Sequence, residues 1–380
     1  MHKRWPAVFA AFVISSGAFA QTTAPRSGTL VIQGGGESTV ARDEFIRLAG
    51  GAKANIVVIP TAAGLDSYGE DFQANYFRGF REQGVTAISL LHTTSRQTAD
   101  SDAFVAPLAN ATGVWFPGGR QWRLADAYLG TKTEAALWRL LERGGVIGGT
   151  SAGATILGSY LTRGDTRGAL PPMGDHERGF AFLRNCAIDQ HILVRNRQFD
   201  LIPVIHAHPE LLGLGIDQDA AIVVQGDEFR VLTGYVAIYD PALVLANDRF
   251  YFLEKGERFR LSNRTPMSAD GKPRWMPQLM PPAKLTAAQL GDIAGTYRAG
   301  EHVIRIVTSE GQVKATLCPG DERELIPLSA DLWFEKYEAW KLTIHRAPDG
   351  KVSGFTWNVG PEVGIHRCVE GTVEAVRTGM

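Results

Sequence analysis

Short apolar runs, separated by longer stretches of mixed polar and apolar residues, dominate the first part of the chain. The runs have the length of buried strands, and the stretches between them are long enough to form helices. This alternation predicts an α/β fold, with a mostly parallel sheet and flanking helices. The runs lie at residues 30–32, 56–59, 87–91, 114–116 and 146–147.

These runs end in turns that are rich in Gly, Pro or Thr. Ligands of open α/β sheets bind at the carboxyl ends of the strands. We therefore expect a site assembled from the turns at residues 34–37, 60–62, 117–119 and 148–153.

Beyond Asp217 the pattern changes to short alternating strands, at residues 220–224, 229–232, 235–239 and 250–253, which predicts an antiparallel extension of the same domain. Residues 262–284 are polar and hold five prolines, so we expect a linker there. The alternation in the rest of the chain predicts a small β-barrel or sandwich of unknown role. The expected domains are a catalytic domain at 28–261, the linker at 262–284 and a β-domain at 285–380.

The first twenty residues have the features of a secretory signal peptide. Basic residues at 2–4 precede an apolar stretch at 7–14, and Ala18-Phe19-Ala20 forms a cleavage site. We expect removal of residues 1–20 and a periplasmic or secreted protein. The 39 basic and 40 acidic residues nearly balance, so neither nucleic acid nor a membrane surface is an expected partner.

The chain has three cysteines. We expect Cys186 to be a buried, unreactive side chain. Cys318 and Cys368 both lie in the predicted β-domain, and the sequence leaves their pairing open.

A Gly-x-Ser-x-Gly segment, Gly149 to Gly153, follows the apolar run at 146–147. In a nucleophile elbow the chain turns so sharply from strand to helix that the central serine becomes exposed. Ser151 is therefore the candidate nucleophile. A small residue at a tight strand–helix crossing would explain the glycines but not the polar residue between them.

Three further motifs extend the pattern. Pro-Gly-Gly-x-Gln occupies residues 117–121, Asp189-Gln190-His191 follows an apolar run, and Arg195 and Arg197 come shortly after. Together with Gly-Thr-Ser-Ala-Gly-Ala at 149–154, these motifs resemble cyanophycinases, in the serine peptidase family that also contains the aspartyl dipeptidases. The resemblance covers about residues 28–240 and implies a fold like that of the class I glutamine amidotransferases, with serine in place of cysteine.

The resemblance implies an exported serine exopeptidase that cleaves β-aspartyl-arginine units through an acyl-enzyme. Ser151 would attack and His191 would move the proton, whereas His176, His206 and His208 are weaker candidates for the base. The oxyanion would be held by the backbone N–H of Ala152 and by a backbone N–H of the Gly118–Gly119 turn, which we predict to be that of Gly119. No cofactor or metal is expected, since no His-Glu-x-x-His spacing occurs.

The third catalytic residue departs from the family's pattern. Gln218 stands where relatives carry a glutamate, and Asp217 and Asp219 flank it. An amide can orient an imidazole by a hydrogen bond but stabilises the imidazolium less than a carboxylate does. The sequence leaves open whether Gln218, Asp217 or Asp219 orients His191.

The resemblance also implies a substrate pocket. An acid and amides suit a guanidinium, and arginines suit carboxylates. Two charges depart from the family's pattern, because Asp200 stands where a third arginine is usual and Arg120 replaces an acid. The pocket residues would be Gln121, Asp189, Gln190, Arg195 and Arg197.

The expected partner is a peptide or a cyanophycin-like polymer, and a homodimer is the assembly to test. The alternatives are an α-aspartyl or isoaspartyl dipeptidase and a non-catalytic periplasmic peptide-binding relative. The neutral Gln218 favours the last of these.

Overall fold

The computed structural model describes residues 22–66, 68–280, 282–318, 320–336, 340–359 and 371–379. The chain divides into two compact units, residues 1–274 and 275–380. The boundary falls within the segment expected to be a linker, but the first part of that segment belongs to the first unit. There, β13 (Arg258–Arg260) pairs with β14 (Thr265–Met267) at the edge of a sheet. The predicted signal peptide lies outside the described residues, as do the side chains of Cys318 and Cys368.

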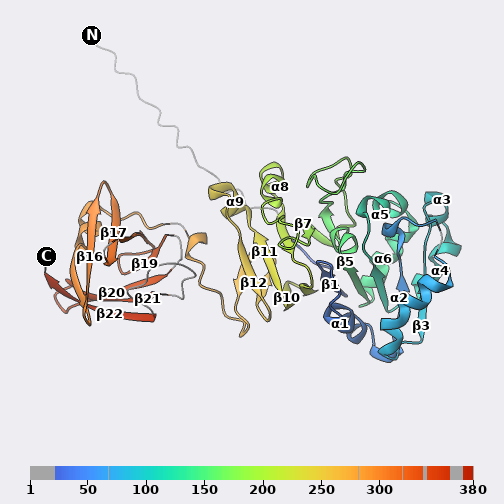
Figure 1. The fold of residues 1–380 in the computed structure, drawn as a ribbon, viewed down its shortest axis with the longest axis horizontal. Coiled ribbons are helices and arrows are strands. Elements are labelled where there is room, and N and C mark those ends of the chain that lie inside the picture. Colours follow the sequence, from blue (N-terminus) through green and yellow to red (C-terminus); the bar gives the residue numbers. More distant parts are fainter. Residues whose placement is uncertain are drawn as a thin grey trace, which may run out of the picture. The chain divides into compact units, whose positions relative to one another are not determined.

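A nine-stranded sheet forms the centre of the first unit (Figure 1), with the order β14-β13-β10-β9-β1-β5-β4-β2-β3. Five neighbouring strands, β1, β5, β4, β2 and β3, run parallel to one another. On the other side of β1, the strands β9, β10, β13 and β14 each pair antiparallel with their neighbours. The mostly parallel α/β fold predicted from the apolar runs is therefore confirmed. The remaining strands of this sheet are β1 (Thr29–Gln33), β2 (Asn55–Val58), β3 (Ala87–Leu90), β4 (Gly113–Phe116), β5 (Val146–Thr150), β9 (Ala221–Gln225) and β10 (Glu228–Thr233).

Helices cover both faces of this sheet. Leu30 of β1 lies in one core with side chains of α5 and α6, whereas Val31 lies in another core with side chains of α1 and α2. Because successive side chains of a strand point to opposite faces, residues 30–32 of β1 must all be apolar, which is why they form a continuous apolar run. The helices of the unit are α1 (Val40–Leu48), α2 (Glu70–Glu82), α3 (Arg96–Ala99), α4 (Asp102–Ala109), α5 (Gln121–Tyr128), α6 (Lys132–Glu142), α7 (Ala152–Thr155), α8 (Leu201–Ala207) and α9 (Pro241–Asn247).

A second sheet, with the order β12-β11-β8-β7-β6, lies in the same unit. The sequence predicted one continuous antiparallel extension, but β9 and β10 join the large sheet while β11 and β12 join this second one. Its neighbouring strands β7 and β8 run parallel, so Gln190 and Ile216 at their carboxyl ends are neighbours. The strands are β6 (Gly158–Tyr160), β7 (Leu183–Gln190), β8 (Leu212–Ile216), β11 (Tyr235–Tyr239) and β12 (Tyr251–Glu254).

The second unit contains a closed antiparallel barrel of strands β15 to β22, drawn in orange and red in Figure 1. Aromatic side chains that include Trp333, Trp357, Tyr297 and Phe355 fill its core. The sequence predicted either a barrel or a sandwich for this unit, and the structure shows a barrel. The strands are β15 (Gly295–Ala299), β16 (His302–Ser309), β17 (Gln312–Cys318), β18 (Asp321–Pro327), β19 (Leu332–Glu335), β20 (Lys341–Arg346), β21 (Val352–Val359) and β22 (Gly371–Gly379), preceded by α10 (Ala287–Asp292).

Among the described residues, every helix is too short or too polar to cross a membrane.

Candidate active site

Ser151 lies between β5 and α7 in a backbone conformation that L-residues rarely adopt, with φ 55° and ψ −116°. Such strain is typical of nucleophile elbows, where it must be compensated by the surroundings. Here the N–H of Ser151 donates to the carbonyl of Gln33 at 3.0 Å, which ties the elbow to the end of β1. At Gly149 and Gly153 a Cβ atom would overlap backbone atoms of neighbouring segments, so both positions require glycine.

Ser151, His191 and Gln218 form a chain of hydrogen bonds. The Oγ of Ser151 lies 3.1 Å from Nε2 of His191, and Nδ1 of His191 lies 3.1 Å from Oε1 of Gln218. Because an amide oxygen only accepts, Nδ1 carries the ring proton, and Nε2 is left to accept the proton of the serine hydroxyl. The three residues come from the ends of β5, β7 and β8, which the two sheets bring to one place.

Gly35 lies against the ring of His191. It has φ 116°, and a Cβ atom there would overlap the imidazole. The N–H of His191 also donates to the carbonyl of Gly34 at 3.1 Å. The turn after β1 therefore positions the base, a role for which its glycines gave no specific signal in the sequence.

The pKa of His191 is lowered below that of an ordinary histidine. Burial is the main cause, and the positive charges of Arg195 and Arg197 act in the same direction. The hydrogen bond with Gln218 and the charge of Asp217 oppose the shift. The lowered pKa favours the neutral imidazole, which is the form that a general base needs.

Asp217 and Asp219, the alternatives to Gln218, both hold backbone groups. The Oδ1 atom of Asp217 accepts from the N–H of Leu193 at 2.9 Å, which fixes the loop after His191. The Oδ1 atom of Asp219 accepts from the N–H of Ser38 at 2.7 Å. The structure thus brings Gln218 to the imidazole and gives both carboxylates other partners.

The rival histidines have partners of their own. His176 lies between Asp126 and Asp175, at 2.8 and 3.0 Å. His206 pairs with Asp248 at 2.6 Å, and His208 lies 3.6 Å from Glu210.

The turn proposed to contribute to the oxyanion hole lies beside the nucleophile. A Cβ atom on Gly118 would come within 3.3 Å of the Cβ of Ser151. Gly119 has φ 140° and lies so close to the carbonyl of Ala62 that a side chain would overlap it. Ala152 is fully buried as the first residue of α7. Both N–H groups chosen from the sequence therefore belong to segments next to Ser151.

Most of the predicted pocket residues are buried and hydrogen-bonded within the protein. The Nε2 atom of Gln121 donates to the carbonyl of Thr162 at 2.6 Å. Arg197 donates through Nη1 to both the backbone and side-chain oxygens of Gln190, at 3.3 Å. Arg195 is the exposed member of the set.

Asp189 has a partner that the sequence did not predict. Its side chain is fully buried, and Arg163 binds its two oxygens, with Nε to Oδ1 at 2.8 Å and Nη2 to Oδ2 at 2.7 Å. This bidentate ion pair occupies both oxygens of Asp189, so its expected role as a ligand of a substrate guanidinium would require Arg163 to be displaced and stays a prediction. The sequence analysis missed Arg163, because no motif marks it.

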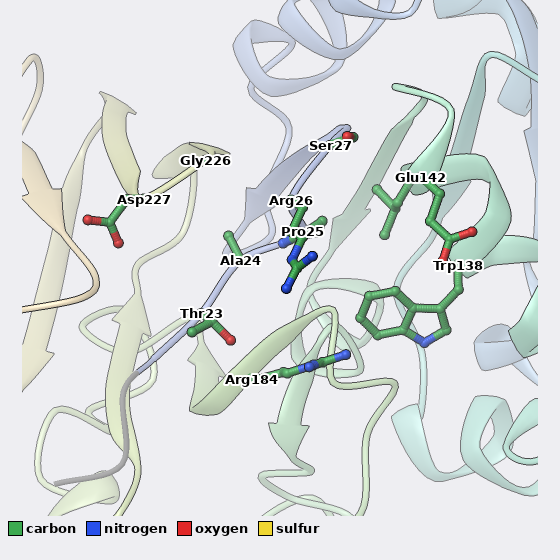
Figure 2. Close-up of a pocket in the computed structure, with 11 residues that line it drawn as sticks. Thr23, Ala24, Pro25, Arg26, Ser27, Trp138, Glu142, Arg184, Gly226 and Asp227 are labelled. Carbon is green, nitrogen blue, oxygen red and sulfur yellow. The ribbon is translucent and has the colours of Figure 1, made fainter.

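A cavity of 780 Å³ lies elsewhere in the first unit, before the amino end of β1 (Figure 2). Residues 23–27 line one side and Trp138 and Glu142 lie opposite, while Arg184 lies beside Thr23, with which it forms a β-bridge. The predicted site residues instead cluster at the carboxyl end of β1, so this cavity is separate from the candidate active site. Within the described residues, no group of three or more His, Cys, Asp or Glu side chains could hold a metal ion.

The sequence profile of Peptidase family S51 matches residues 28–232, more than half of the chain. The chain belongs to this family. A cyanophycinase from Nostoc sp. (strain PCC 7120) is 33% identical over 271 residues, which cover 65% of this chain and 89% of the relative. A cyanophycinase from Geminocystis herdmanii is 30% identical and covers 64% of this chain and 97% of the relative. A crystal structure of a peptidase from an acI-B1 actinobacterium matches with a TM-score of 0.48 and 22% identity, over 63% of this chain and 98% of that one.

Family S51 membership makes the chain a serine-type peptidase, a hydrolase that resembles the cyanophycinases. The matched residues contain the elbow, the base and Gln218. The barrel of the second unit lies outside them.

Proposed function

We propose that this protein is a cyanophycinase-like serine exopeptidase that releases the β-aspartyl-arginine units of cyanophycin through an acyl-enzyme. The hydrogen-bond chain from Ser151 through His191 to Gln218 carries the proposal. The relatives named cyanophycinase, at 30 to 34% identity, support this substrate class.

In the proposed mechanism, Oγ of Ser151 attacks the carbonyl carbon of the bond that joins one β-aspartyl-arginine unit to the next, while Nε2 of His191 takes the hydroxyl proton. The N–H groups of Ala152 and Gly119 stabilise the oxyanion of the tetrahedral intermediate. The C–N bond then breaks, and the leaving amine takes the proton from His191. Water, deprotonated by His191, attacks the acyl-enzyme ester and releases the aspartyl carboxylate with Ser151 regenerated.

Gln218 keeps the imidazole in the required tautomer but brings no negative charge. It therefore stabilises the imidazolium less than a carboxylate would, and we infer a slower enzyme rather than an inactive one. Cyanophycin incubated with the purified chain, and with Ser151→Ala, tests the function. Release of β-aspartyl-arginine by the unmodified chain alone is expected. Release of neither this dipeptide nor aspartate from α- or β-aspartyl peptides would contradict the proposal and favour a peptide-binding role.

We also propose that the protein is exported. The support is the signal-like sequence of residues 1–20. Sequencing the amino terminus of protein recovered outside the cytoplasm should begin at Gln21, whereas an intact Met1 on the recovered protein would argue against cleavage.

A further inference from the structure

The cavity before the amino end of β1 has a fixed wall. This wall, residues 23–27, is tied to the fold at both ends. Thr23 and Arg184 exchange two backbone hydrogen bonds, at 3.3 and 2.9 Å, and the N–H of Thr29 donates to the carbonyl of Gly145 at 3.1 Å. The volume of 780 Å³ is that of a small-ligand site. The cavity is therefore preformed and large enough for part of a peptide.

Two arginine side chains reach into this cavity, Arg26 from the wall and Arg184 from β7, and both point toward Trp138 (Figure 2). The guanidinium of Arg184 lies over the indole ring, 5.3 Å from its centroid. Within the described part of the chain, no oxygen accepts a hydrogen bond from the guanidinium of Arg26 or of Arg184. A guanidinium presents a planar fork of donors that matches a carboxylate. Both groups are therefore placed to bind a carboxylate of a ligand.

Two acidic side chains complete the charged lining of the cavity, Asp227 and Glu142. Asp227 is already engaged, because Oδ1 accepts from the N–H of Ser262 at 2.9 Å and Oδ2 accepts from the hydroxyl of the same residue at 2.5 Å. Glu142 follows Trp138 by four positions in α6, so the two share one face of that helix, and Figure 2 shows the carboxylate beside the indole. The lining thus carries two charges of each sign, which suits a ligand with both signs better than a simple anion.

A β-aspartyl-arginine unit has this combination of groups. Its amide bond uses the α-amino group of the arginine, so the α-carboxylate and the guanidinium both stay free. The carboxylate would meet Arg26 and Arg184. The guanidinium would meet Glu142 and stack on Trp138. The methylene stem would lie along Leu141, an apolar residue that lines the cavity.

We propose that this cavity is a second, non-catalytic site, which binds one β-aspartyl-arginine unit of a cyanophycin chain while another part of the same chain lies at Ser151. The inference rests on the proposed function and adds the means by which a polymer is held. The five residues of β1 separate the two sites by at least about 16 Å, at about 3.3 Å per residue. A chain of many units spans this separation, whereas a fragment of two units, at about 3.6 Å per backbone residue, does not. Holding a remote unit raises the effective concentration of the polymer at Ser151.

The test compares cyanophycin with a two-unit fragment as substrates of the full chain and of the double variant Arg26→Gln/Arg184→Gln. We expect KM for the polymer to rise about tenfold or more, because hydrogen bonds between charged groups are lost. KM for the fragment, and kcat on either substrate, should change less than about twofold, since the candidate active site is remote. The matched control is Arg78→Gln/Arg81→Gln, which removes two exposed arginines of α2 outside the cavity and should leave all values unchanged.

A binding measurement keeps this inference separate from the proposed function. In a chain that also carries Ser151→Ala, and so cannot turn over, retention on immobilised cyanophycin should fall about tenfold with the double variant and stay unchanged with the control. If the unmodified chain releases no β-aspartyl-arginine, the proposed function fails, and this retention alone decides on the cavity.

Three kinetic outcomes would overturn the second site and leave the release of β-aspartyl-arginine intact: an unchanged KM for the polymer, an equal rise for polymer and fragment, or an equal rise with the control variant. Equal retention with and without the double variant would overturn it as well. Thermal unfolding of the double variant must match that of the unmodified chain. If it does not, Glu142→Gln, which removes one charge of the cavity, must raise KM for the polymer about threefold or more, and a smaller change would overturn the site.

Discussion

Gln218 is the residue at which the site departs from an ordinary serine hydrolase. Its amide oxygen lies 3.1 Å from Nδ1 of His191, so Gln218→Glu would place a carboxylate there. A nearby negative charge favours the imidazolium and therefore raises the pKa of His191. We predict that the acidic limb of the kcat/KM profile moves to higher pH, and that the rate above this limb rises about tenfold or more.

The measurement is a pH–rate profile of both proteins for the release of β-aspartyl-arginine from cyanophycin. Since neither Asp217 nor Asp219 is bonded to the imidazole, no other carboxylate already fills this position. An unchanged profile would contradict the assignment of Gln218 as the orienting residue.

Gly35 allows a second prediction at the residue scale. A methyl group there would overlap the ring of His191 and push it away from Ser151. We expect Gly35→Ala to lower kcat by about 100-fold or more, since small displacements of a base have effects of this size. Gly50→Ala is the control, because Gly50 has nearly the same φ, 117°, and its added Cβ would meet nothing nearer than 3.7 Å. Equal loss in the two variants would show that backbone strain alone is responsible.

The sequence predicted the residues that motifs mark and missed those that only the fold brings together. Ser151 lies in an elbow pattern and His191 in a family motif, so the sequence predicted Ser151 as the nucleophile and His191 as the base. Arg163 lies 26 positions from Asp189, in a segment with no recognisable pattern. When two paired charges lie this far apart in the sequence, their pairing depends on which loops contact each other in the fold. The local sequence does not encode these contacts.

At the scale of elements, the loop between β6 and β7 contacts two of the predicted pocket residues, through Thr162 to Gln121 and through Arg163 to Asp189. Removing the side chain of Arg163 would leave Asp189 buried without its ionic partner. We predict that Arg163→Met lowers the free energy of unfolding by about 3–5 kcal/mol, measured by urea denaturation. Arg167→Met, in the same loop, removes an arginine that is 86% exposed and pairs with Asp165. It should cause little change, and similar losses in the two variants would refute a special role for the buried pair.

The strands themselves were predictable, but their division between two sheets was not. The apolar runs of β1, β2, β4 and β5 mark buried parallel strands, and each was found. The alternating segments that form β9 to β12 predict strands but do not predict which strands they pair with. Whether a strand continues the first sheet or joins a second depends on tertiary packing. The neighbouring ends of β7 and β8, which carry His191 and Gln218, could not be foreseen for this reason.

At the scale of the molecule, all residues of the candidate site belong to the first unit. Each unit has its own hydrophobic core, a feature of parts that fold independently. We predict that a chain of residues 22–274 folds and hydrolyses short cyanophycin fragments within about twofold of the full-length rate. Steady-state kinetics and thermal unfolding of the shortened chain test this. A loss of activity on short cyanophycin fragments in a shortened chain that still folds would mean that the barrel contributes to the chemistry.

The closure of the barrel affects the order of events during synthesis. β15 pairs with β22, and Thr296 faces Gly379, so the first strand must wait for the last before its hydrogen bonds are complete. The ladders between β1, β5 and β9 are available once residue 225 has left the ribosome. The catalytic unit can therefore begin folding during translation. The barrel remains an open ribbon with two bare edges until residues 371–379 emerge, and in this interval it is most exposed to proteases and to pairing with other nascent chains.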